Sequence, residues 1–491
     1  MKLQVLLPLL AAPLLSAAQP NVVILYADDL GYGDISCNGA TAVQTPNIDR
    51  LAKEGLNFHS AYSTASTCTP SRYSLMTGKY PFRQEGTGIL PGDAAMIIPT
   101  DAPTLPSVMK AAGYRTAAIG KWHLGLGGRG GIDWNQTVTP GPNQVGFDYT
   151  FIMPATADRM PCVYMENGKV VNLDPKDPIK VSYVHRLEGE APPLPKEKQA
   201  MESNPQHSMG FLNGVGRIGH MTGGAKALWN DQEMSSTFCH QATQFIRSSG
   251  GKPFFLYYAM HNIHVPRLPN PKFAGKTPMG PRGDSIVEAD WQVGEILRTL
   301  DELKLADNTL VILSSDNGPV VNDGYKDMSA MKLGSHKPAG PFSGGKYSCS
   351  EGGIRMPFIV RWPAKVKPGG TTEAMVSQVD LPRSLAHLAG KPVADDAFQD
   401  SQDVVPALLG ESKTGRDHIV GLGDRITLRV GDWKYISPAS DKKPGALFDL
   451  SKDLQEKSNL AQSEPAKLKE MAERLEKIAG KPKPAQPVSE E

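Results

Sequence analysis

The segment NVVILYADD, residues 21–29, is a short apolar and aromatic run that ends in two aspartates. Its length and its β-branched content favour a buried strand over a helix. Residues 284–305 instead repeat apolar side chains near the helical period. Strand-like runs recur along the chain at 116–119, 253–259, 309–314 and 357–361. Strands that alternate with helices predict an α/β fold, with a large, mainly parallel sheet between layers of helices.

Polar side chains follow four of these apolar runs. Asp28 and Asp29 come directly after the first run. The later runs are followed by Lys121 and His123, by His261 and His264, and by Asp316 and Asn317. Ligands of parallel sheets bind beyond the carboxyl ends of the strands. We therefore expect these side chains to meet at one edge of the sheet.

The overall charge of the chain is nearly balanced, which argues against a function that depends on a large net charge. The chain of 491 residues has 52 Lys plus Arg and 51 Asp plus Glu. Nucleic-acid binding proteins usually carry a marked basic excess, so we expect no nucleic-acid partner. Any function that depends on charge must arise from a local cluster.

The N-terminus has the pattern of an export signal. Lys2 precedes an apolar run that extends to Leu15, and the small residues at 16–18 suit a signal peptidase. The run is shorter than the roughly 20 residues that span a bilayer. We predict a cleaved signal at 1–18, no membrane span, and a periplasmic or secreted protein.

The remaining sequence divides into two predicted units. A catalytic domain is expected at 19–400, with an irregular insertion at 155–225 that is typical of a lid or a substrate-reading surface. A smaller α+β subdomain with a short antiparallel sheet is expected at 401–480. The Pro- and Lys-rich tail at 481–491 is predicted to be disordered.

Three carboxylates and one amide form a candidate metal site: Asp28, Asp29, Asp316 and Asn317. All four offer hard oxygen ligands, which suit Ca²⁺ or Mg²⁺ better than zinc or copper. Clustered carboxylates repel one another unless a cation lies between them. Each pair alone also has a structural interpretation, because acidic residues cap helices and Asp-Asn-Gly suits a turn.

Two lysines and two histidines are candidate catalytic residues: Lys121, His123, His264 and Lys346. Lys121 and His123 are two residues apart at the end of a strand, and can therefore point to the same side. Lys346 lies in a glycine-rich loop that suits an anion. The alternatives are a surface lysine, buried structural histidines and a flexible loop.

The chain has five cysteines, an odd number that leaves at least one unpaired by internal disulfides. Cys68 is the candidate for the unpaired cysteine. We expect Thr69 to cap a helix that begins at Pro70, which places Cys68 and Arg72 in a region that attracts anions. One interpretation is a reactive thiol of low pKa. A soft thiolate suits a hard cation poorly, however, and an oxygen nucleophile fits better.

The motifs together resemble one family. Residues 68–72, CTPSR, followed by Thr77 and Gly78, resemble the sulfatase signature C-x-P-S-R…T-G. Further segments resemble the remaining family motifs in the family's order: 21–34, GKWHLG at 120–125, HNIHVP at 261–266, DNG at 316–318, and 344–363. The resemblance extends from about residue 20 to 460.

The resemblance implies an alkaline phosphatase-like fold and one divalent cation, usually Ca²⁺. It also implies that a separate formylglycine-generating or anaerobic sulfatase-maturing enzyme oxidises Cys68 to formylglycine (3-oxoalanine), whose hydrate is the nucleophile. By motif match, the implied metal ligands are Asp28, Asp29, Asp316, Asn317 and the modified Cys68.

The implied reaction is sulfuryl transfer to a hydroxyl of residue 68. Arg72 is expected to hold this hydrated side chain, while Lys121 and Lys346 bind the sulfate. His264, with Lys346, is expected to protonate the leaving oxygen, and His123 to remove the proton that lets sulfate depart.

The expected substrate is a sulfated carbohydrate such as a mucin or glycosaminoglycan fragment. Candidate sugar-reading residues in the insertion are Arg159, His185, Arg186, His207 and His220. The alternatives are a broad arylsulfatase, a phosphate or phosphonate monoester hydrolase of the same superfamily, and an inactive carbohydrate-binding relative.

Overall fold

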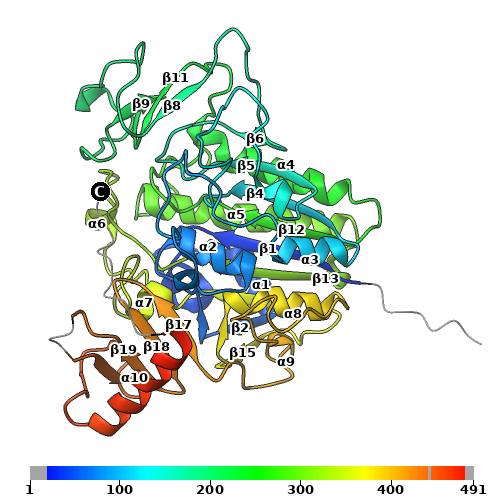
Figure 1. The fold of residues 1–491 in the computed structure, drawn as a ribbon, viewed down its shortest axis with the longest axis vertical. Helices are drawn as coiled ribbons and strands as arrows, with labels where there is room; N and C mark the ends of the chain where they lie inside the picture. The colour runs from blue at the N-terminus through cyan, green and yellow to red at the C-terminus, as the bar shows by residue number, and fades with distance from the viewer. Residues whose placement is uncertain (1–18, 441–443, 481–491) are drawn as a thin grey trace, which may run out of the picture.

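The computed structural model describes residues 19–440 and 444–480. The predicted signal at 1–18 and the predicted tail at 481–491 lie outside the described residues. A ten-stranded sheet crosses the larger part of the molecule (Figure 1). Its order is β15 (Gly370–Thr372), β2 (Leu56–Phe58), β14 (Phe358–Arg361), β13 (Thr309–Ser315), β1 (Asn21–Ala27), β12 (Phe254–Ala259), β4 (Arg115–Lys121), β5 (Tyr149–Met153), β6 (Met165–Glu166) and β7 (Lys169–Val170).

The five central strands, β13, β1, β12, β4 and β5, are parallel. Val23 pairs with Leu256 on one side and with Val311 on the other, and all three side chains are buried. The five predicted segments are all strands of this sheet, although β14 runs antiparallel to β13. The prediction of a mainly parallel α/β sheet is confirmed.

Helices cover both faces of the sheet (Figure 1). One layer contains α1 (Pro46–Lys53), α4 (Met234–Arg247) and α5 (Pro281–Glu302), and the other contains α2 (Cys68–Thr77), α3 (Leu105–Ala111) and α8 (Leu381–Leu388). Short helices α6 (Ser329–Lys332), α7 (Glu351–Ile354) and α9 (Val405–Leu408) lie in connections.

The long helix α5 begins three residues before the predicted start and ends before the predicted end. Pro281 occupies its first turn, where proline is well tolerated. Lys304 adopts a φ of 57°, which the right-handed helix does not allow. The helix therefore stops at Glu302, and Leu305 belongs to the following turn.

The insertion supplies β6 and β7, which form one edge of the large sheet, and further short antiparallel pairs that lie beyond this edge (Figure 1). Its pairs are β8 (Lys180–Ser182) with β11 (His220–Thr222) and β9 (Gly210–Leu212) with β10 (Val215–Arg217). Strands of three residues are too short to show a periodic pattern, which explains why the sequence of this region gave no strand signal.

The C-terminal part contains a separate four-stranded antiparallel sheet, as predicted. Its strands are β17 (Ile419–Leu422), β18 (Ile426–Val430), β19 (Trp433–Ile436) and β20 (Ala446–Asp449). Helix α10 (Pro465–Ala479) packs on it through Met471 and Leu475. A further pair, β3 (Ala61–Tyr62) and β16 (Val376–Ser377), lies apart from both sheets. Across 19–440 and 444–480, no helix has the length and hydropathy required to cross a membrane.

Candidate active site

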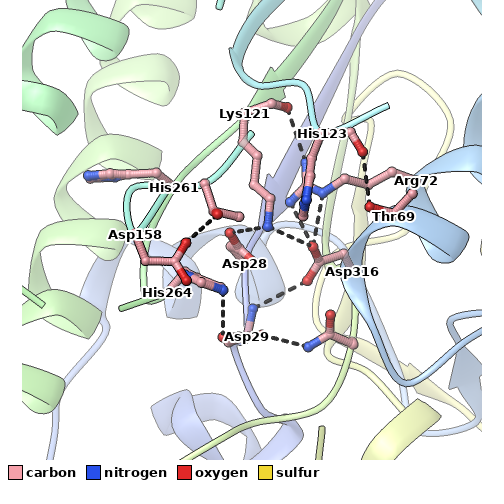
Figure 2. Close-up of polar contacts among 12 residues, drawn as sticks. Asp28, Asp29, Thr69, Arg72, Lys121, His123, Asp158, His261, His264 and Asp316 are labelled. Carbon is pink, nitrogen blue, oxygen red and sulfur yellow. Dashed lines mark hydrogen bonds and ion pairs between the residues drawn. The ribbon is translucent and has the colours of Figure 1, made fainter. Parts of the chain in front are cut away.

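The predicted carboxylates converge because β1 and β13 are parallel neighbours. Ala27 pairs with Ser315 at the ends of these strands, so the residues that follow both strands emerge side by side. Carboxylate oxygens of Asp28, Asp29 and Asp316 lie within 4.8 Å of one another. In Figure 2, Asp28 and Asp316 both contact Lys121, and Asp29 lies below them with a contact to His264. All three are buried.

Two buried oxygen atoms of this cluster have no hydrogen-bond partner among the described residues: Asp28 Oδ1 and Asn317 Oδ1. The Asn317 amide instead donates through Nδ2 to Asp29 Oδ1 at 2.7 Å, which leaves its oxygen free for another ligand. Burial, and then the neighbouring Asp316, raise the pKa of Asp28 well above its usual value. Unpartnered hard oxygens among like charges fit a divalent cation.

Two lysines contact different carboxylates of the cluster. Lys121, the last residue of β4, places Nζ 2.6 Å from Asp28 Oδ2 and 3.8 Å from Asp316 Oδ2. Lys346 places Nζ 3.0 Å from Asp29 Oδ2 and 2.8 Å from Asp323 Oδ2. Burial opposes the charge of Lys346, but Asp29 and Asp323 outweigh burial and raise its pKa, so the ammonium remains protonated.

Arg72 binds Asp316 through two of its guanidinium nitrogens. Its Nε and Nη2 donate to Asp316 Oδ2 at 2.9 and 2.8 Å, and its Nη1 donates to the Tyr257 hydroxyl at 3.0 Å. The guanidinium is completely buried. It therefore fixes the orientation of one candidate metal ligand.

Cys68 is the first residue of α2, and its side chain is 2% exposed. The prediction that the helix begins at Pro70 with Thr69 as its cap is wrong. The extended residue Thr67 occupies the cap position, and the Thr69 hydroxyl donates to the His123 carbonyl at 3.1 Å. The Cys68 sulfur lies with Asp28 and His264 in a group whose ligand atoms are within 4.8 Å.

The Cys68 thiol is not acidic. Burial raises its pKa to about 12, with Asp316 adding to the shift against the opposing charge of Lys121. Since the thiolate is the reactive form of cysteine, a neutral thiol here is a poor nucleophile. All five cysteines are free.

His123 presents an unpartnered ring nitrogen. Its Nε2 lies 2.9 Å from the Leu90 carbonyl, which can only accept, so Nε2 carries the proton. Its buried Nδ1 has no partner in the described part of the chain. Burial, and then Lys121 and Arg159, lower the pKa of His123 well below its usual value. The ring is therefore neutral, with a free lone pair on Nδ1.

His264 is also buried and held by a carbonyl. Its Nδ1 donates to the Val265 carbonyl at 2.8 Å, and its Nε2 lies 3.9 Å from Asp29 Oδ2. Burial and then Lys346 lower the pKa of His264 well below its usual value. His261 faces away from this group and contacts Asn262 Oδ1 through Nδ1 at 3.2 Å (Figure 2).

Two family profiles match the chain. One, described as sulfatase, matches residues 20–391. The chain belongs to the sulfatase family. It is a sulfuric ester hydrolase, and enzymes of this family use a metal ion and a formylglycine residue. The second profile, described as N-sulphoglucosamine sulphohydrolase, C-terminal, matches residues 345–481.

Individual relatives extend over nearly the whole sulfatase. It is 47% identical over 481 residues to the N-acetylgalactosamine-6-O-sulfatase of Bacteroides thetaiotaomicron, with 94% of each chain covered. It is 32% identical to human arylsulfatase A, in an alignment that covers 93% of this chain and 86% of the human enzyme. A solved structure from work on glycosaminoglycan metabolism by B. thetaiotaomicron has 47% identity and a TM-score of 0.91, covering 94% and 100% of the two chains. The predicted family and fold are confirmed.

Sequence reasoning missed Asp323 and Asp158, two carboxylates that face His264. Burial opposes their ionisation, but Lys346 lowers the pKa of Asp323 and Arg159 lowers the pKa of Asp158, each with help from His264. Asp323 lies in a turn-like Asn-Asp-Gly segment, and Asp158 lies in the irregular insertion. Neither residue belongs to a recognisable motif in the sequence, and only the fold brings each of them close to His264.

One of the five candidate residues in the insertion carries a charge that acts on the catalytic group. Arg159 pairs with Asp158 at 2.9 Å, which raises the pKa of Arg159 against the effect of burial, and the Arg159 charge in turn lowers the pKa of His123. His185 and Arg186 are exposed, and Arg186 donates to the carbonyls of its own loop. The remaining two are engaged with neighbours, His207 with Asn204 and Asp158, and His220 with Glu190.

Proposed function

We propose that this sulfatase removes an O-sulfate group from a sulfated carbohydrate, with residue 68 acting after oxidation of Cys68 to formylglycine. The observation that carries the proposal is the buried group in which Cys68 approaches Asp28 and His264 while hard oxygens on Asp28 and Asn317 lack partners. A thiol of pKa about 12 supports an oxygen nucleophile in its place.

Asp28, Asp29, Asp316, Asn317 and residue 68 would hold one divalent cation, with Ca²⁺ preferred and Mg²⁺ as the alternative. The donor set is made of oxygen atoms, which suits both ions, and the resemblance to the family's motifs favours Ca²⁺. When bound, such a cation offsets the carboxylate charge and polarises sulfate oxygens.

Lys121 and Lys346 bind the sulfate oxygens in this proposal. Both ammonium groups are buried beside the carboxylates, where water does not screen them. Arg72 keeps Asp316 oriented through its two-nitrogen contact, so that the oxygen nucleophile and the sulfur meet in a fixed geometry.

His264 and Lys346 supply the proton for the leaving oxygen. In the free protein Lys346 is the protonated partner, whereas His264 is neutral with its Nε2 lone pair directed into the site. The negative charge of a bound sulfate ester favours protonation of His264. The proton then passes from Nε2 to the alcohol oxygen as its bond to sulfur breaks.

His123 acts as the base that completes the cycle. Its Nδ1 has a free lone pair, and its ring is held by the Leu90 carbonyl on the opposite nitrogen. Nδ1 removes the proton from the second hydroxyl of residue 68, which allows sulfate to leave by elimination rather than by attack of water at sulfur.

The substrate is proposed to be a 6-O-sulfated N-acetylgalactosamine unit or a close relative within a glycan. The 47% identity over nearly the entire length of an N-acetylgalactosamine-6-O-sulfatase supports this class. Arg159 is suited to read the sugar. Its Nη1 contacts both oxygens of Asp158 and the Thr156 hydroxyl, whereas Nε and Nη2 have no partner in the described residues. A fork of free donors matches the oxygens of vicinal hydroxyls.

The test is sulfate release from a matched panel. N-acetylgalactosamine 6-sulfate, its 4-sulfate isomer, N-acetylglucosamine 6-sulfate and an aryl sulfate are compared at equal concentration. The proposal predicts the highest kcat/KM on a 6-sulfated sugar. Turnover of the aryl sulfate alone would contradict a carbohydrate substrate and favour a broad arylsulfatase, consistent with the 32% identity to human arylsulfatase A. Release of phosphate but not sulfate would contradict the reaction itself.

We further propose that a separate maturing enzyme modifies Cys68, and that the chain is exported to the periplasm or the medium. The motif at 68–72 supports the first proposal, and the pattern at 1–18 supports the second. Co-expression with and without a maturing enzyme tests the first. Fractionation of cells that express the full chain tests the second.

A further inference from the structure

The turn between β17 and β18 of the C-terminal sheet lies between the two chain segments that carry Cys68 and Lys346. Residues 422–425 form this turn, which we call the clamp turn. Residues 64–66 lead into α2, and residues 347–349 follow Lys346 directly. Figure 1 shows β17 and β18 beside α7, the helix that follows the second segment.

Main-chain hydrogen bonds join the three segments in a closed ring. The Ser66 N–H donates to the Leu422 carbonyl at 2.7 Å, and the Leu422 N–H donates to the Thr64 carbonyl at 2.9 Å. The Tyr347 N–H donates to the Ser66 carbonyl at 2.9 Å. The Asp424 N–H donates to the Tyr347 carbonyl at 3.1 Å. Each segment is therefore bonded to both of the others.

Tyr347 is held in a conformation that it would not adopt alone. Its φ is 73°, in the left-handed region that disfavours residues with a side chain. Both of its backbone polar groups are bonded, one to Ser66 and the other to Asp424. Since Lys346 precedes Tyr347, this backbone setting directs the ammonium that contacts Asp29 and Asp323.

The clamp turn makes two further close contacts with the same segment. The Asp424 side chain accepts from the Cys349 N–H at 2.8 Å. A Cβ on Gly423 would lie 2.6 Å from the Cys349 nitrogen and 2.8 Å from its Cα, which are backbone atoms that cannot rotate away. A glycine is therefore required where the turn approaches the segment.

We propose that the clamp turn is a positioning device of the active site. It fixes the Lys346 ammonium relative to residue 68 by holding the segments that carry them, so that the C-terminal sheet contributes to sulfate binding without touching the substrate. Gly423 and Asp424 are the positioning residues. The catalytic part of this inference rests on the proposed function, whereas the structural part does not.

Two readouts on the full-length protein separate these parts. Gly423→Ala and Asp424→Ala are expected to increase hydrogen–deuterium exchange of residues 345–350. Asp424→Asn keeps an oxygen that accepts from Cys349 and should restore protection. Asp432→Ala, at the exposed turn between β18 and β19, is the matched control and should change neither exchange nor activity. Unchanged exchange in Gly423→Ala would overturn the clamp.

The activity readout is a double-mutant cycle with Lys346→Ala. Gly423→Ala alone is expected to lower kcat by roughly tenfold to a hundredfold through misplacement of the ammonium. In the Lys346→Ala background it should lower kcat much less, because the group that it positions is gone. Equal losses in both backgrounds would show a general defect and would overturn the positioning role. A wild-type protein that releases no sulfate from any ester would contradict the proposed function, while a response in exchange would still support the clamp.

Discussion

Asp28 and Glu351 are both carboxylates with no exposed surface, yet their pKa values shift in opposite directions. Burial and the neighbouring Asp316 raise the pKa of Asp28 well above its usual value. Burial also acts to raise the pKa of Glu351, but Lys434, and then Arg355 and Arg429, outweigh it and lower the pKa to about 2. Asp28 has the carboxylates of Asp29 and Asp316 beside it as well as the Lys121 ammonium, whereas Glu351 is surrounded by cations.

The difference separates a functional cluster from a structural one. Glu351 Oε2 accepts from the Tyr62 hydroxyl at 2.5 Å, and its Oε1 forms an ion pair with Lys434 Nζ at 3.0 Å without hydrogen-bond alignment. Lys434 also pairs with Glu456 at 2.8 Å. These contacts join the C-terminal sheet to α7. In the Asp28 cluster, Lys121 and Arg72 do not outweigh burial and the neighbouring carboxylates, and Asp28 Oδ1 has no partner among the described residues, a combination that is common at functional sites.

The largest effect is expected from Asp28→Asn. Loss of one anionic ligand should lower kcat/KM by about 100-fold to 1,000-fold. The cation-free variant should be at least as stable as cation-free wild type, because the raised pKa means that ionised Asp28 costs stability above that pKa. Steady-state kinetics measures kcat/KM, and urea unfolding in the presence of a chelator measures the stability of the cation-free protein. A variant that is active but unstable would reverse the assigned roles of the two clusters.

Glu351→Gln should show the opposite pattern, with a loss of stability of about 3 kcal/mol. The folded pKa of about 2 lies below the value of the unfolded chain, so the ionised form stabilises the fold above the unfolded pKa. This contribution is lost as the pH falls from about 4.5 through 2. Urea unfolding of wild type and variant between pH 7 and pH 3 is the measurement.

The free energies of unfolding of wild type and Glu351→Gln should differ most near pH 7, and the difference should shrink as the pH falls. A constant difference at every pH would mean that the Glu351 charge does not stabilise the junction. Lys413→Gln, a change on an exposed loop, serves as a neutral control.

Cation removal sharpens the comparison further. A cation at 100 times its Kd stabilises the folded state by about 2.7 kcal/mol, so chelation should lower the Tm of wild type and of Glu351→Gln equally. The Tm of Asp28→Asn should change little when the chelator is added. Calorimetry with and without chelator tests this, with Ca²⁺ and Mg²⁺ added back separately. A chelator effect that persists in Asp28→Asn would place the cation elsewhere.

The smallest effect is expected in the insertion. Arg159→Ala should lower kcat/KM for a 6-sulfated sugar by about tenfold to a hundredfold, through loss of hydrogen bonds from a charged donor. His185→Ala and Arg186→Ala should have little effect, since both side chains are exposed and Arg186 is bonded to its own loop. Equal losses for all three variants would mean that the insertion reads the substrate over a wider surface.

The sheet and the convergence of the candidate metal-site residues were predictable because both depend on local patterns. Apolar runs such as 21–27 identify buried strands, and residues after parallel strands must share an edge. The family motifs indicate the candidate roles of Cys68, Lys121 and Lys346 without any knowledge of the local geometry.

The remaining features depend on contacts between distant segments. Asp323 approaches His264 only through the path of a long loop, and the clamp turn meets Ser66 and Tyr347 across more than 70 residues of sequence in each case. The Thr69 hydroxyl bonds to the His123 carbonyl instead of capping a helix, and α2 begins at Cys68 after the extended residue Thr67; the sequence does not reveal this long-range contact.

The most direct test of the account is mass spectrometry of the tryptic peptide 54–72 together with turnover of the same samples. Residue 68 is expected to carry an aldehyde in place of the thiol, and sulfate release is expected to rise in proportion to aldehyde occupancy across preparations. Full activity in a preparation whose residue 68 is entirely the unmodified thiol would contradict the account.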